Sequence, residues 1–237
     1  MVFRRILILI TSISLVGLNA QTNDFEKRLE ESYNLYTNGE HITDWLDGIE
    51  SLEKLGNEFS SKTLANYWAS YFYTQVARAL VNAKEVPKEI NTKYLLDKSQ
   101  GNLDLVRSRI DGSSSVKPSD IHALQYLIYS FRNGTSKDDL MKKKFSDKAE
   151  EELKKAISLN PNNPLCDVII ATNLIKKQDL ESVFAGRILL INAKNKFDQS
   201  MEPKFLTTNW NEEWIKFWLA GANKGVKFLT NPKQVKS

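Results

Sequence analysis

The sequence predicts an all-helical protein, built as a stack of antiparallel helix pairs. Apolar residues recur at helical spacing through most of the chain. No run of alternating apolar and polar residues, the pattern of a half-buried strand, interrupts them. Proline breaks helix interiors, and every proline lies between the periodic segments rather than inside one. These joints are Pro87, Pro118, Pro161, Pro164, Pro203 and Pro232.

Residues 1–20 have the layout of a secretory signal peptide. Arg4 and Arg5 form a positive start, and a short apolar run follows from residue 6 to residue 16. A membrane anchor is the alternative, but the apolar run is shorter than the roughly 20 residues that a spanning helix needs. We therefore expect a periplasmic or secreted protein whose mature chain has no transmembrane segment. No lipoprotein cysteine lies near the cleavage site, and Leu18 leaves the exact site open.

The charge of the mature chain argues against a nucleic-acid partner. Cleavage before Gln21 removes two arginines and lowers the formal net charge from +4 to +2. A nucleic-acid-binding domain is usually far more basic. The lysines are interleaved with acidic residues, as on a solvated helix face. Residues 223–237 form a basic tail that we expect to be frayed.

The first half of the mature chain contains four expected helices. Residues 22–37 carry an aromatic and aliphatic stripe, and residues 43–55 end before Gly56. Residues 63–82 are richly apolar and predict a central buried helix. Residues 90–110 are longer and more polar, with a possible break at a glycine in their middle.

The second half contains five more expected helices. Ser119 is a candidate N-cap for the first of them, and loops rich in Gly, Ser and Asp separate it from its neighbours. Asn209 is a candidate N-cap for the last, Glu212 falls at its capping-box position, and Gly221 is expected to end it. The five helices are expected at residues 119–132, 144–158, 165–178, 187–200 and 209–220.

One stretch carries a repeat signal. In DKAEEELKKAISLNPNNP, Ala149 is followed by Leu153, Ala156 and Pro161, so small residues permit close helix contact and proline ends the second helix. The aromatic run NYWASYFY at residues 66–73 and the closing NW at 209–210 accompany it. With these features the chain resembles a small family of secreted tetratricopeptide-like proteins of Gram-negative bacteria.

The resemblance implies a helical-repeat domain over residues 21–222. The inferred pair starts at residues 22, 63, 119 and 165 are spaced more widely than the roughly 34 residues of a standard repeat. We therefore expect an irregular tetratricopeptide-like stack of about four helix pairs. Because the end of such a stack leaves an apolar face exposed, a closing helix is expected.

Three tryptophans four residues apart mark the expected closing helix. Trp210, Trp214 and Trp218 lie on one side of it. Tryptophan at this spacing favours a packing role, in which the stripe caps the stack. The alternative is an exposed aromatic surface that binds a partner or a sugar.

A search for catalytic or metal-binding patterns finds none, so we predict a protein that is not an enzyme and has no cofactor. His41 and His122 lie on separate helix pairs, and neither has a partner at metal-ligand spacing. Cys166, the only cysteine, has apolar neighbours and is expected to be a buried inert thiol. Ser113 to Ser115 lack the flanking glycines of a nucleophile elbow.

The resemblance to tetratricopeptide stacks implies a groove lined by the first helix of each pair. The primary hypothesis is a scaffold that binds a protein or peptide in the cell envelope. A module for a small molecule or glycan, using exposed aromatic residues, is the alternative, and an unrecognised envelope enzyme is a third. The sequence leaves the oligomeric state open. The candidate partner-binding residues are Asn66, Ser70, Tyr73, Arg78, Gln125 and Tyr129.

Overall fold

The computed structural model describes residues 22–82, 91–111, 114–199, 202–208, 210 and 212–230. The expected signal peptide at residues 1–20 lies outside this range. So do Asn209, the candidate N-cap of the last helix, and residues 231–237 of the tail.

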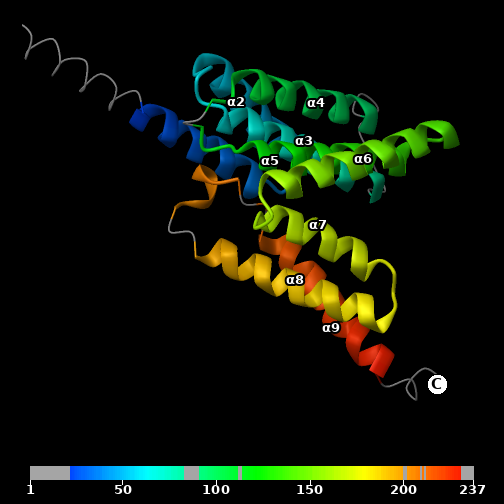
Figure 1. Ribbon diagram of the computed structural model, residues 1–237. Helices are drawn as coiled ribbons and strands as arrows, with labels where there is room; N and C mark the ends of the chain where they lie inside the picture. Colours follow the sequence, from blue (N-terminus) through cyan, green and yellow to red (C-terminus); the bar gives the residue numbers. More distant parts are fainter. Residues whose placement is uncertain are drawn as a thin grey trace, which may run out of the picture.

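The described residues form helices and contain no strand, which confirms the predicted all-helical fold class (Figure 1). The first helix covers residues 22–37. It is followed by α2 (Ile42–Glu58), α3 (Leu64–Asn82), α4 (Thr92–Arg109), α5 (Pro118–Thr135), α6 (Asp139–Leu159), α7 (Pro164–Ile175), α8 (Leu180–Asp198), the short 3-10 helix η1 (Lys204–Leu206) and α9 (Glu212–Thr230).

Neighbouring helices pack in pairs, as expected for an irregular repeat stack. The most extensive contacts join α3 to α4, α5 to α6 and α7 to α8, and α9 packs on α8. In Figure 1 the pair α5 and α6 crosses the middle of the molecule, with α2 to α4 above it and α7 to α9 below. The last helix therefore covers the end of the stack, as predicted.

Helix α3 lies at the centre of the core, and its aromatic side chains fill the space between helices. Tyr67, Trp68, Tyr71 and Phe72 are among the largest fully buried side chains. Tyr36 of the first helix stacks on Phe72, with 3.7 Å between the ring centroids. Aromatic side chains bury large apolar areas, so this cluster supplies much of the hydrophobic driving force for the fold.

The LNPNNP joint ties three parts of the chain together through Asn163. This buried side chain caps α7 by accepting a hydrogen bond from the Leu165 N–H at 2.9 Å. Its amide also donates to Asp120 at 2.9 Å and to Ser119 at the start of α5. Asp120 in turn accepts a hydrogen bond from Thr208, just before α9. Burial raises the pKa of Asp120, and these donors oppose that shift.

The structure corrects several of the expected helix bounds. Helix α6 begins at Asp139 and not at residue 144, and α9 begins at Glu212, so Trp210 precedes it. Helix α4 passes through Gly101 without a break, and a Cβ at this glycine would meet nothing within 4 Å. Helix α8 begins at Leu180, earlier than expected, because Asp179 caps it by accepting from the Ser182 N–H. Helix α9 continues past Gly221 to Thr230, because buried Ala222 and half-buried residues beyond it still pack against the stack.

No described helix combines the length and the apolar character that crossing a bilayer requires.

Replacing Asn163 by alanine removes the α7 cap and leaves buried Asp120 short of a donor. We expect Asn163→Ala to lower the free energy of unfolding by about 2–3 kcal/mol, as measured by urea denaturation. The exposed neighbour Asn162 is the matched control. Asn162→Ala should change the free energy of unfolding by about 0.5 kcal/mol or less. Equal effects of the two substitutions would show that the joint does not depend on Asn163.

Cys166 is buried in α7, and burial raises its pKa to about 12. Because the thiolate is the reactive form, the native protein should react with a thiol reagent at pH 8 far more slowly than the same protein in urea. The absorbance change with a disulfide reagent measures both rates. Comparable rates in the two conditions would contradict the burial of Cys166.

Candidate functional site

Four of the six predicted partner-binding residues lie inside the helix packing. Asn66, Ser70, Tyr73 and Gln125 are each no more than 5% exposed. In this structure their polar groups bond to neighbouring helices, so they do not form an open surface. Arg78 and Tyr129 are half-buried.

The buried polar groups form a seam between α2, α3 and α4. Asn66 donates to Asn102 at 3.0 Å, and Asn102 donates to Glu53 at 2.7 Å. Glu53 also accepts from the Tyr73 hydroxyl at 3.0 Å. Further hydrogen bonds extend the seam along the helices. Ser99 bonds to Ser70 and to Thr74, and Lys98 donates to Glu53.

Gln125 links α5 to α4 in the same way. Its amide and that of Gln100 donate to each other, at 2.8 and 2.9 Å. Arg107 also donates to Gln125 at 3.1 Å. Tyr129 stacks on Phe145 of α6 instead, with 6.2 Å between ring centroids. The first-helix groove that the resemblance implies is therefore filled by packing at these positions.

The tryptophan stripe divides into a core residue and two residues at the edge of the core. Trp210 is 2% exposed and stacks on Tyr71 with 5.7 Å between centroids. Its indole N–H donates to the Tyr67 hydroxyl at 3.1 Å. Trp210 thus has the predicted capping role, with its ring inserted against α3.

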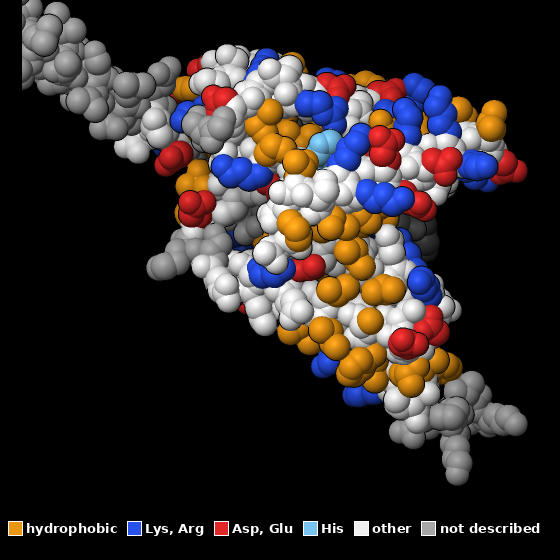
Figure 2. Space-filling model, viewed as in Figure 1, with side chains coloured by type: hydrophobic (Ala, Val, Ile, Leu, Met, Phe, Trp, Pro, Cys, Tyr) orange, Lys and Arg blue, Asp and Glu red, His pale blue; other side chains and the backbone are white. Residues whose placement is uncertain are grey.

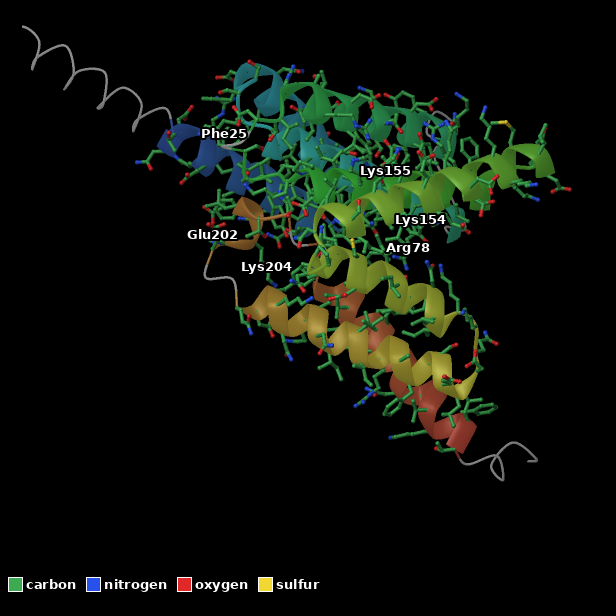
Figure 3. The ribbon with its side chains drawn as sticks, in the orientation of Figure 1. Phe25, Arg78, Lys154, Lys155, Glu202 and Lys204 are labelled. Atoms are coloured by element: carbon green, nitrogen blue, oxygen red, sulfur yellow. The ribbon has the colours of Figure 1, made fainter. Side chains whose placement is uncertain are left out.

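Trp214 and Trp218 are half-buried, and each carries a cation over one ring face. The Arg78 guanidinium carbon lies 5.2 Å from the Trp214 ring centre, and the Lys176 nitrogen lies 5.9 Å from that of Trp218. In Figure 3 Arg78 lies in the space between α6 and α7. Both indole N–H groups are buried without a hydrogen-bond partner.

An apolar groove opens beside Trp218. We call it the α9 groove, and its volume is about 670 Å³. The C-terminal half of α9 forms one side, and the end of α7 with the start of α8 forms the other. Its lining residues are Ile175, Lys176, Gln178, Val183, Phe217, Trp218, Gly221, Lys224, Gly225, Phe228 and Leu229.

The two glycines on the α9 side of the groove, one turn apart, have different surroundings. A Cβ at Gly221 would meet nothing within 4 Å, whereas a Cβ at Gly225 would lie 3.3 Å from Val183 Cγ1. Phe217 and Phe228 stand on the same helix and are 63% and 59% exposed. Gln178 lies in the turn after α7, on the side of the groove opposite α9. Its φ of 61° is a backbone conformation that residues other than glycine rarely adopt.

The charge of the groove lining is positive. Lys176 and Lys224 are the charged side chains among the described residues that line it. No carboxylate is among the groups that shift the pKa of Lys176. Burial lowers the pKa of Lys176, and the nearby positive charge of Arg78 lowers it further. The lining thus combines exposed aromatic side chains with cations.

Sequence reasoning singled out Trp214 and Trp218 but missed the groove beside them. The available signal was the spacing of Phe217, Gly221, Lys224 and Phe228, which repeats every three or four residues. Treating Gly221 as a helix end hid that pattern.

A second hollow of about 500 Å³ lies near the first helix. It is lined by polar and apolar side chains, including Phe25 and Glu202; Figure 3 labels Phe25 on the first helix and Glu202 near η1. A further apolar stripe is exposed on α8, at Leu180, Phe184 and Ile188, and hydrophobic side chains gather over α7 and α8 in Figure 2.

The histidines do not form a metal site in the described part of the chain. His122 Nδ1 lies 2.5 Å from a Glu152 oxygen and joins α5 to α6. The N-cap of α2 is His41. The described ranges contain no group of three or more His, Cys, Asp or Glu side chains arranged to hold a metal ion.

Comparisons with known proteins find no matching family model, no matching curated protein and no matching solved structure. The tetratricopeptide-like resemblance therefore stays a prediction, whereas the all-helical stack is observed.

Trp210, which precedes α9, and Phe217, which lies on α9, distinguish the capping contact from the groove. We expect Trp210→Ala to lower the free energy of unfolding by about 3–5 kcal/mol, because it empties a buried site next to Tyr71. Phe217→Ala should lower it by about 0.5 kcal/mol or less, because the ring is mostly exposed. Urea denaturation followed by far-ultraviolet circular dichroism measures both, and a large loss in Phe217→Ala would place that ring in the core.

Proposed function

We propose that this chain is a binding protein, without catalytic activity, that holds a peptide segment of another protein in the α9 groove. The observation that carries the proposal is the exposure of Phe217 and Phe228 on either side of the open Gly221 position. Exposed aromatic side chains grouped around a concave site are typical of binding surfaces.

The architecture supports a scaffold role. Helical stacks present extended surfaces for partners, and the last helix of a stack is free to carry a site on its outer face. Trp210 holds the start of α9 in the core, while the half that follows Phe217 lines the groove. The anchored half fixes the geometry of the exposed half.

A peptide fits the groove better than a sugar that stacks on tryptophan. Sugar stacking uses an open ring face, and one face of Trp214 and one face of Trp218 already carry Arg78 and Lys176. The groove instead offers apolar walls that suit bulky aliphatic or aromatic side chains. Binding in the cell envelope follows from the expected signal peptide and is part of the proposal.

Filling the groove should abolish binding without harming the fold. A Cβ at Gly221 would meet nothing within 4 Å, so Gly221→Leu places its side chain in the open space beside this turn. A display library of random twelve-residue peptides is selected against the full chain, and the affinity of the enriched peptides is measured by fluorescence anisotropy. We expect Gly221→Leu to weaken their binding at least tenfold.

The matched control is Gly134→Leu in α5. A Cβ at Gly134 also meets nothing within 4 Å, and this glycine is remote from the groove lining. Both substitutions replace a helical glycine, so both should maintain or raise stability. Peptides that bind Gly221→Leu as tightly as the unchanged protein, or a selection that enriches none, would refute peptide binding in the α9 groove.

A further inference from the structure

We propose that the partner segment is an acidic amphipathic helix about three turns long, whose carboxylates lie over Lys176 and Lys224. This inference rests on the proposed function, because it specifies the chemistry of the peptide that the α9 groove binds. Three properties of the groove carry it: the charge of its lining, the absence of a strand edge, and its length.

The described residues that line the groove supply two cations, and none of them is acidic. Lys176 and Lys224 lie among Phe217, Trp218 and Phe228, so an anion bound there would sit next to apolar surface. Both lysines are exposed, so an ion pair with either would weaken as the salt concentration rises. Lys176 is held against Trp218 and has no described carboxylate as partner. A carboxylate of the bound peptide would pair with the Lys176 ammonium.

The backbone around the groove favours a helical partner over an extended one. An extended peptide that binds by strand addition needs a strand edge, and the described residues include no strand. A helix satisfies its own backbone groups and presents apolar side chains on one face. A Cβ at Gly221 would meet nothing within 4 Å, so such a helix can approach α9 closely at this turn.

The length of the groove sets the length of the helix. Phe217 and Phe228 are separated by roughly 16 Å along α9, given the rise of an α-helix. A partner helix of about eleven residues spans the same distance. Its apolar positions would contact the two phenylalanines and Trp218, and its acidic positions would face the lysines.

Two other occupants fit less well. A membrane surface is flat, whereas this site is a groove with α9 on one side and Ile175 and Val183 on the other. A second copy of the chain, related by a two-fold axis, would bring its own Lys176 and Lys224 toward the same lysines.

The test uses three fluorescein-labelled synthetic peptides with identical leucines at helical spacing. The surface positions between the leucines carry Glu in one peptide, Gln in the second and Lys in the third. Anisotropy titrations use the full chain at low and at physiological salt. We expect the Glu peptide to bind at least tenfold more tightly than the Gln peptide at low salt, and the Lys peptide to bind most weakly.

Substitutions then test whether the tighter binding of the Glu peptide depends on the lysines of the α9 groove. Lys176→Met keeps an apolar stem over Trp218 and should weaken the Glu peptide roughly tenfold while leaving the Gln peptide unchanged. Lys224→Met should act in the same direction, and Lys176→Arg should retain the preference. Lys143→Met, an exposed lysine on α6 outside the groove, is the control and should have no effect.

The outcomes separate this inference from the proposed function. Equal binding of the Glu and Gln peptides, both blocked by Gly221→Leu, overturns the acidic partner and leaves peptide binding standing. A protein that binds the display-selected peptides but none of the three model peptides also overturns this inference alone.

Two further measurements test the other occupants. Binding to phosphatidylglycerol vesicles that depends on Phe217 and Lys176, without binding of the Glu peptide, would assign the groove to a membrane surface. A dimer in sedimentation velocity that Gly221→Leu dissociates would assign it to a second copy. Either result overturns the acidic helix.

Discussion

The insertion of Trp210 against α3 is the contact on which the closing helix and its groove depend. Its ring lies on Tyr71, and its N–H bonds to the Tyr67 hydroxyl. A second hydrogen bond, from the Trp68 indole to the Phe205 carbonyl, holds the preceding segment on the same helix. Together these contacts fix where α9 begins, and α9 then packs on α8. The open half of α9 is positioned by a contact made in the core.

The seam between α2, α3 and α4 has a different role from the aromatic cluster. Apolar burial supplies most of the driving force, but it is not directional. The bonds from Asn66 to Asn102 and from Asn102 to Glu53 each require one relative placement of two helices. An unpaired buried amide or carboxylate is costly, so alternative helix placements are disfavoured. The seam thus selects one packing arrangement among several that would bury the same apolar area.

Helical spacing and proline positions were sufficient to predict the fold class and the pairing of the helices, because both follow from local patterns. The capping role of Trp210 was also predictable. The placement of Asn66 and Ser70 was not, because a polar stripe on a helix looks the same whether it faces solvent or another polar stripe. The groove was missed for a similar reason: Gly221 ends a helix in many contexts, and only the packing of Ala222 and the residues beyond it determines that α9 continues.

The contact between Trp210 and Tyr67 also constrains the order in which the molecule can assemble. The two residues are separated by 143 positions in the chain. The helix pairs before α9 form from contacts between near neighbours, and such contacts form early. The closing contact requires nearly the whole chain to have been synthesised, and its loop-closure entropy is the largest of any contact described above. The α9 groove is therefore completed last, so a chain that is still emerging from the ribosome does not yet have it.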